Sequence, residues 1–137
     1  MKQRQINILK VYHQASAAEL QSGMRWYQQA HEDATAIANT LPIGAGAIAA
    51  LSPGLRWESN VEAARRVIAG ESLDGLGVRW YDGVRKAKRI AKGHNPLVVL
   101  KGNKVRAFYS CILSPDASQS VCVDGHAYSV WAGKRIL

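Results

Sequence analysis

The sequence predicts an all-α fold, a compact domain of several helices. Apolar residues recur at helical spacing through most of the chain, and Gly, Pro and Asn residues separate the segments that show this spacing. Residues 43–51 are apolar and rich in Gly and Ala, which suits a central helix approached closely by its neighbours. With 137 residues, 47% of them hydrophobic, the chain is long enough to bury such a core.

The helices expected from this spacing follow one another with short connections. In chain order we expect them over residues 5–14, 17–39, 43–51, 56–69, 81–92, 97–100, 105–113 and 125–131. Ser16 is expected to cap the second helix, with Glu19 completing a capping box. We place all of this in one domain, residues 1–137, with N-terminal helices over 1–40 and a core over 41–132.

The segment over residues 120–130 allows a second interpretation. Val121, Val123 and Tyr128 tolerate extended structure, so a β-hairpin is the alternative to the last helix. In the helical interpretation, Asp124 lies directly before that helix, where Asp is a favoured capping residue.

Positive charge is concentrated in one part of the chain. Lys and Arg number 18 against 10 acidic residues, a net charge of +8. Half of the cations fall within residues 79–106, where Asp82 is the one acid: Arg79, Arg85, Lys86, Lys88, Arg89, Lys92, Lys101, Lys104 and Arg106. A solvated basic face without a nucleic-acid role is the alternative, but a basic surface around a compact turn favours binding to DNA phosphates. We therefore expect DNA as the partner.

Composition argues against several other classes of protein. Two cysteines, Cys111 and Cys122, are too few for an iron–sulfur cluster or an all-cysteine zinc site, and we expect reduced thiols. The four histidines show no metal-ligand spacing, so we expect no metal and no cofactor. No apolar run reaches the length of a membrane span, and the N-terminus lacks a secretory pattern. A cytoplasmic protein without a membrane partner is expected.

Residues 97–113 form the most informative unit. They predict a short helix, a tight turn centred on Gly102, and a second helix. A glycine lets the backbone approach a phosphate, and the amides that open the next helix point at the anion. An ordinary corner between two helices is the alternative.

The order of three sequence motifs resembles the helix-hairpin-helix DNA glycosylases of base-excision repair. The first is Ile-Ala-Ala-Leu-Ser at residues 48–52, followed by Asn60 and a helix. The second is Gly-Val-Arg-Lys-Ala-Lys-Arg-Ile at residues 83–90. The third joins the Leu-x-Gly turn at residues 100–102 to Val-Asp-Gly-His at residues 123–126, about as far apart as in that family.

The resemblance implies a catalytic carboxylate, a set of DNA-binding residues and a pocket for the base. Asp124 would stabilise positive charge on the sugar, or orient a water, while the base is flipped out of the duplex and its N-glycosidic bond is cleaved. DNA contacts would come from Lys86, Lys101, Gly102, Asn103, Lys104 and Arg106. The base pocket would include Trp57, Asn60 and His126.

Each of these roles has a plainer alternative. Asp124 can serve only as a helix cap, and His126 only as a surface group. The aromatic residues Trp57, Trp80, Tyr81 and Tyr109 are mostly candidates for the core. One of them would stack on the extruded base, and Trp57 is our first choice because it follows the Leu-Ser motif.

The chain also departs from the family's pattern. Arg106 stands where bifunctional members carry a nucleophilic lysine, and a guanidinium cannot act as that nucleophile, so no lyase activity is expected. Lys104 replaces the second glycine of the hairpin, and Gly54 replaces a polar residue, often Gln. A small variant without the iron–sulfur cluster resembles phage-encoded relatives of these repair and modification enzymes. The alternatives are a non-catalytic DNA-binding module and a phage protein that inhibits a host factor.

Overall fold

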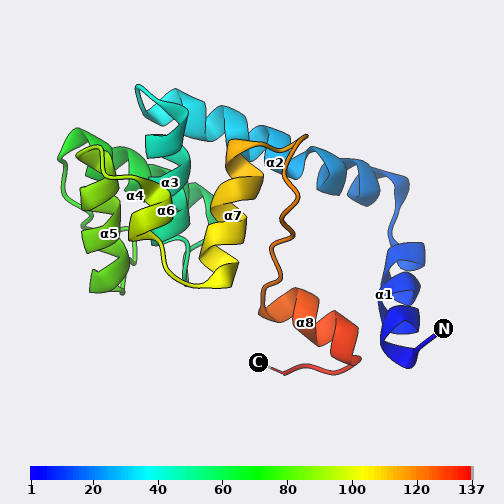
Figure 1. The fold of residues 1–137 in the computed structure, drawn as a ribbon. Helices are drawn as coiled ribbons and strands as arrows, with labels where there is room; N and C mark the ends of the chain where they lie inside the picture. Colours follow the sequence, from blue (N-terminus) through cyan, green and yellow to red (C-terminus); the bar gives the residue numbers. More distant parts are fainter. Residues whose placement is uncertain (137) are drawn as a thin grey trace. The chain divides into compact units, whose positions relative to one another are not determined.

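The computed structural model describes residues 1–136 and is all-helical (Figure 1). Its eight helices are α1 (Gln3–Gln14), α2 (Ala17–Ile37), α3 (Leu41–Leu51), α4 (Trp57–Ala69), α5 (Tyr81–Ala91), α6 (Pro96–Val99), α7 (Asn103–Leu113) and α8 (Gly125–Ala132). No strand occurs within residues 1–136, so the all-α prediction is confirmed. The β-hairpin alternative for residues 120–130 is wrong, because Asp124 caps α8 directly after an irregular segment.

The helices belong to two compact units. One unit holds Met1–Trp26 and the chain from Cys122 onward, and the other holds Tyr27–Val121. The boundary between them falls within α2, whose start is capped as the sequence predicts: the Glu19 amide donates to Ser16 Oγ at 3.1 Å.

In the second unit, α3 is the central element. Its residues from Gly44 to Leu51 are all buried, and α4, α5, α6 and α7 pack against it (Figure 1). Small side chains make this possible, because a Cβ on Gly44 would collide with the backbone carbonyl of Ala34 in α2. The predicted role of residues 43–51 as a closely packed central helix is confirmed.

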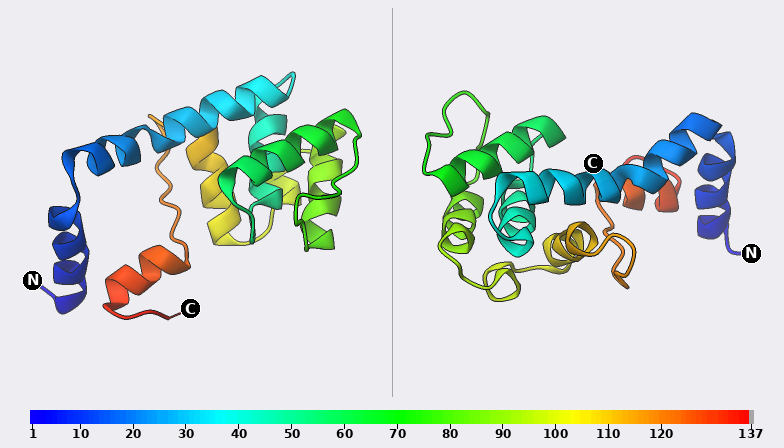
Figure 2. Two further views of the ribbon diagram at one scale, coloured as in Figure 1. Left: turned by 180° about the vertical axis from the view of Figure 1, so that it is seen from behind. Right: turned by 90° about the horizontal axis from the view of Figure 1, so that it is seen from above.

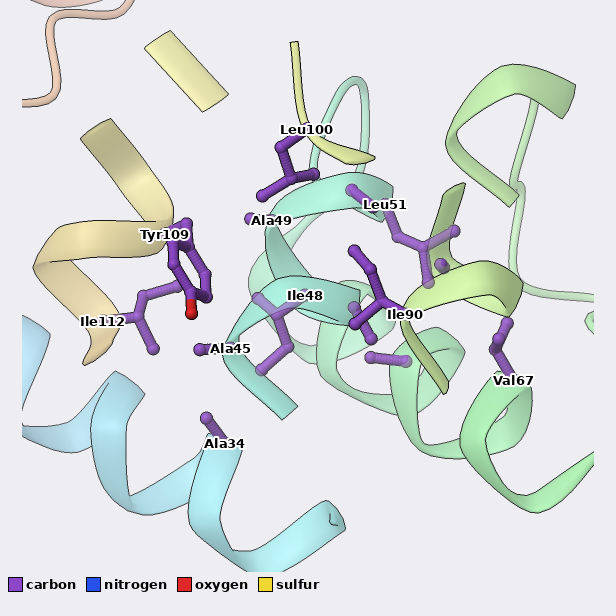
Figure 3. Packing of buried hydrophobic residues seen from close by; sticks show 14 of the residues in the cluster. Ala34, Ala45, Ile48, Ala49, Leu51, Val67, Ile90, Leu100, Tyr109 and Ile112 are labelled. Atoms are coloured by element: carbon purple, nitrogen blue, oxygen red, sulfur yellow. The ribbon is translucent and has the colours of Figure 1, made fainter. Parts of the chain in front are cut away.

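The core of this unit is assembled around Ile48 of α3. Figure 3 shows Ile90 of α5 on one side of Ile48, and Tyr109 and Ile112 of α7 on the other. Ile48, Ile90, Ile112 and Leu100 are among the largest fully buried side chains. Helix α5 and the turn between α6 and α7 are thus fixed to one core.

The first unit pairs the two ends of the chain but buries little. Helices α1 and α8 lie next to each other (Figure 2), and Asn7 Nδ2 donates to the Trp131 carbonyl oxygen at 3.1 Å. The Arg4 guanidinium carbon lies 4.2 Å from the centroid of the Trp131 ring, a cation–π contact. No residue of either helix, both fully described, is buried. This unit is therefore stabilised by a few polar and aromatic contacts.

Candidate nucleic-acid interface

The turn between α6 and α7 is anchored by buried and capped residues on its N-terminal side. Asn95 Oδ1 accepts a hydrogen bond from the Leu97 amide at 3.0 Å, and Leu100 is fully buried. The chain then reverses over Lys101 and Gly102, which are exposed. Gly102 has φ 89° and ψ 144°, a conformation that residues with a Cβ adopt only with strain. The glycine therefore sets the shape of the turn.

Helix α7 starts at this turn with its first residues in solvent. The Arg106 amide donates to the Gly102 carbonyl at 3.2 Å, which closes the first turn of the helix. The backbone amides at the start of a helix have no hydrogen-bond acceptor within that helix, and this applies to the residues of α7 before Arg106. The N-terminal end of a helix also carries partial positive charge. The side chains of Asn103, Lys104 and Arg106 are exposed around it. An anion at this turn would meet both backbone amides and cationic side chains.

Helix α5 carries the other part of the basic stretch. Ala87 and Ile90 are buried against the core, while the cations of the helix lie mostly on the opposite side. The exposed cations on α5 and next to it are Arg79, Arg85, Lys88, Arg89 and Lys92. The helix is therefore strongly amphipathic, and its polar face is cationic.

The whole net charge of the protein resides in residues 79–106. This stretch holds nine of the 18 cations and one of the 10 acids, so the rest of the chain holds nine of each and is neutral. An excess of one sign on a single surface produces an attractive field for polyanions. The remaining surface contributes no net charge to that field.

Asp82, the acid within the stretch, holds two of its cations. Arg85 Nη2 lies 2.9 Å from Asp82 Oδ1, and Lys86 Nζ lies 2.8 Å from Asp82 Oδ2. The hydrogen bond from Lys86, and then that from Arg85, lowers the pKa of the Asp82 carboxyl. Lys86 is thus committed to an internal ion pair, whereas Arg85 still has 77% of its side chain exposed.

A hollow of about 220 Å³ joins α5 to the turn. Lys86 of α5 and Lys101 of the turn both line it, so the two parts of the basic stretch meet on one surface. Gly83 lets α5 pack closely against α3, because a Cβ there would lie 2.5 Å from the Ala50 carbonyl oxygen near the end of α3. We call this region, residues 79–106 of α5 and the turn, the basic surface.

Helix α4 carries arginines in a different setting. Arg65 lies 2.9 Å from both Glu62 and Glu71, and Arg66 lies 2.9 Å from Glu62. Arg66 also donates to the carbonyl oxygens of Ser72 and Asp74, so the network ties the loop after α4 to the helix. Hydrogen bonds from Arg65 and then Arg66 lower the pKa of Glu62 to about 2. These arginines serve the protein's own structure.

Asp124 and His126, the expected catalytic and pocket residues near the end of the chain, lie at the start of α8 in the first unit. Asp124 Oδ1 accepts a hydrogen bond from the Ala127 amide at 2.8 Å, so the carboxylate is the N-cap of α8. Its side chain is half-buried, and His126 is exposed on the first turn of the helix. The capping role of Asp124 is confirmed, and its catalytic role stays a prediction.

Trp57 and Asn60, the other residues expected in a base pocket, lie on α4 in the second unit. Trp57 Nε1 donates to Asp33 Oδ2 at 3.0 Å, and its ring packs against the core. Asn60 is buried, and its Oδ1 has no hydrogen-bond partner within the described residues. Neither residue lines the hollow beside the turn. Trp57 is thus tied to α2, and Asn60 is enclosed in the core of the second unit.

Trp80 and Tyr81 are the aromatic residues that the structure places at the basic surface. Their exposed fractions are 61% and 91%, whereas Tyr109 is buried. Trp80 lines the hollow together with Lys86 and Lys101. From the sequence, Trp80 is mostly a candidate for the core. Helical periodicity could not have identified it, because Trp80 lies seven residues before Ala87 and so falls on the face that the period assigns to the core; the structure makes it the N-cap residue of α5.

The sequence model of a family described as "Family of unknown function (DUF7178)" matches residues 1–136. No curated protein and no solved structure matches the chain. Within residues 1–136, no group of three or more His, Cys, Asp or Glu side chains is placed to hold a metal ion. No single described helix is long and apolar enough to cross a membrane, and α2 with α3 passes that test only as a pair bent by 111°.

Proposed function

We propose that this chain, which belongs to the DUF7178 family, binds DNA through the basic surface and the turn at Gly102. The observation that carries this proposal is the location of the entire net charge of +8 in residues 79–106. DNA is the polyanion that such a surface fits, because it presents a regular row of phosphates. The turn at Gly102, which has a positive φ, and the open end of α7 add backbone amides to the cationic side chains.

Contacts of this kind position a protein on DNA without reading its sequence. Lys and Arg side chains displace the counterions of the phosphates, so the affinity should fall steeply as salt rises. The exposed cations Lys101 and Arg106 lie in the turn and on the first turns of α7, and exposed cations of α5 such as Lys88 would add further phosphate contacts. The turn would bind one phosphate through the amides that follow Gly102.

The finer proposal is base excision without lyase activity. A base is flipped out, water adds to the anomeric carbon of the sugar, and the bond to the base breaks as the base leaves with a proton. Asp124 would stabilise the positive charge that develops on the sugar. Its capping bond to Ala127 uses one acceptor position of a carboxylate that has several, so the two roles are compatible. Arg106 at the lysine position supports the absence of a Schiff-base step.

A matched substitution tests the chemistry without disturbing the fold. Asparagine caps helices about as well as aspartate, so Asp124→Asn removes the charge and keeps the cap. Free bases released from a panel of damaged and modified DNAs are measured by mass spectrometry for the wild type and this variant. Release by the wild type alone, with equal DNA affinity in both proteins, is the expected result.

Two other outcomes select the alternatives. Salt-sensitive DNA binding without base release from any DNA of the panel would identify a non-catalytic DNA-binding module. Absence of DNA binding would overturn the proposal and favour a phage protein that acts on a host factor. Release that persists in Asp124→Asn would remove Asp124 from the chemistry.

A further inference from the structure

Trp80 is held at the surface in a defined position. It is the N-cap residue of α5, and its carbonyl oxygen accepts a hydrogen bond from the Val84 amide at 3.2 Å. Its indole lies over the loop after α3, where a Cβ on Gly54 would stand 3.4 Å from Trp80 Nε1. A tryptophan with 61% exposure leaves a large apolar face in water, which folding alone does not favour.

The hollow beside Trp80 has the lining of a site for one aromatic ring. Pro53, Leu100 and Val105 contribute apolar walls, and Lys86 and Lys101 contribute the cationic groups. At about 220 Å³ it is smaller than the pockets of ~300–1,000 Å³ that hold drug-sized ligands. A single flat ring that brings an attached negative charge fits both its size and its chemistry.

We infer that Trp80 stacks on one unpaired nucleobase of the bound DNA, with the base in the hollow beside the turn and its phosphate on Lys101. This inference rests on the proposed DNA binding. Nucleobases offer a flat face to aromatic side chains whatever their sequence, and cations nearby hold the backbone. Lys86 is already paired with Asp82 at 2.8 Å, so Lys101 is the phosphate ligand. A base inside a duplex has both faces covered, so the site selects unpaired bases.

The hollow on the other side of Trp80 is a poorer site for a nucleotide. It is lined by Glu71 and Asp74 as well as by Arg79 and Lys88. Glu71 is paired with Arg65 at 2.9 Å, but the carboxylate of Asp74 would face the phosphate of an entering nucleotide and repel it. The hollow beside the turn contains one acid, Asp82, which is neutralised by Lys86 and Arg85. The charges therefore direct the base to the side of the turn.

The first test measures the affinity of fluorescein-labelled single-stranded oligothymidylate by anisotropy. Removal of the stacking ring in Trp80→Ala should weaken binding by about 5- to 150-fold, the range found for one base stacked on one aromatic side chain. Trp80→Phe should lose less. Tyr81→Ala is the matched control, because Tyr81 is more exposed but does not line the hollow. All variants should keep the salt dependence of the wild type, since the phosphate contacts are unchanged.

The second test uses intrinsic fluorescence. Unlabelled oligothymidylate should quench the tryptophan emission of the wild type, and this quenching should be lost in Trp80→Phe although three tryptophans remain. If Trp80→Ala binds as tightly as the wild type and Trp80→Phe is still quenched, the inference is overturned while salt-sensitive binding upholds the proposed function. If the wild type shows no salt-sensitive DNA binding, the proposed function fails and this inference with it. Should Trp80→Ala fail to fold, as judged by circular dichroism, Trp80→Phe decides both measurements.

Discussion

Helix α4 and the basic surface use cationic side chains in opposite ways. On α4, Arg65 and Arg66 are held by Glu62 and Glu71 at 2.9 Å, and they fix the following loop. On the basic surface, Asp82 binds Arg85 and Lys86, and no other acid lies between residues 79 and 106. Both regions belong to the same compact unit and have the same core behind them.

The difference shows that a count of cations does not locate a binding surface. A cation paired with a carboxylate contributes to the protein's own structure, and its charge is cancelled at a distance. A cation without such a partner attracts an anion from solution. The local balance of acidic and basic side chains is therefore more informative about a binding surface than the number of cations. Substitutions that change this balance should change DNA affinity.

The largest effect on DNA affinity is expected from the triple variant Lys88→Ala, Lys101→Ala and Arg106→Ala. Loss of three charge-assisted phosphate contacts should weaken DNA binding by roughly 100-fold or more at physiological salt. It should also reduce the slope of log affinity against log salt by about 3. The control is Arg65→Ala with Arg66→Ala, which should keep the affinity within about twofold and lower the melting temperature. Equal loss of DNA affinity in both variants would mean that α4 contributes to DNA binding as much as the basic surface does.

A second comparison uses one left-handed glycine from each region. Gly102→Ala should destabilise the fold by about 1–3 kcal/mol, because φ 89° with ψ 144° is nearly restricted to glycine. Gly70→Ala, at the C-cap of α4 with φ 74° and ψ 22°, should cost about 1 kcal/mol. Urea unfolding measures both. DNA affinity should fall only in Gly102→Ala, and an unchanged affinity there would exclude the turn from the binding surface.

The α4 network also predicts a dependence on pH. The pKa of Glu62 in the folded protein, about 2, lies below its ordinary value of 4.5, so the network's contribution to stability is complete above about pH 4.5. That contribution is lost as the pH falls from 4.5 towards 2, because protons then compete with Arg65 and Arg66. Hydrogen exchange of the loop amides at residues 71–77 should show increased opening over this range. In Glu62→Gln the loop should be more open already at neutral pH and change less on acidification.

The smallest effect on DNA affinity is expected at Asp82, where two cations of the basic surface are paired with a carboxylate, as the arginines of α4 are. Asp82→Asn removes the one acid of the surface and releases Arg85 and Lys86 to an external anion. We expect DNA affinity to rise on the order of threefold at low salt, with the gain lost at high salt because exposed charges are screened. Glu71→Gln on α4 is the control and should leave the affinity unchanged. A fall in affinity for Asp82→Asn would mean that Asp82 is needed to position Lys86.

Features set by local sequence were predicted correctly. The small apolar residues around Ile48 indicate the central helix, and the spacing of Ala87 and Ile90 indicates a helix with a cationic outer face. Ser16 and Asp124 cap helices where capping residues are expected. Gly102 lies at the turn because the chain reverses there with a positive φ. Each of these depends on neighbours within one or two helical turns.

Features that depend on contacts between residues far apart in the chain could not be predicted from the sequence. Nothing in the spacing of residues predicts that Arg4 and Trp131 meet, because their contact joins the two ends of the chain. The sequence favours Trp57 as the stacking residue, but its indole nitrogen donates a hydrogen bond to Asp33 of α2. Trp80, the N-cap residue of α5, lies exposed instead. The environment of an aromatic residue depends on which helix lies over it, and periodicity does not give that information.

If the local balance of charge locates the binding surface, DNA contacts the basic surface and not α4. The most direct test is an NMR titration of ¹⁵N-labelled protein with a short DNA. The amides from Gly102 to Arg106 and along α5 should shift, these shifts should disappear at high salt, and the amides of α4 and its loop should stay unchanged. Shifts confined to α4, or no salt-dependent shifts on the basic surface, would contradict this prediction.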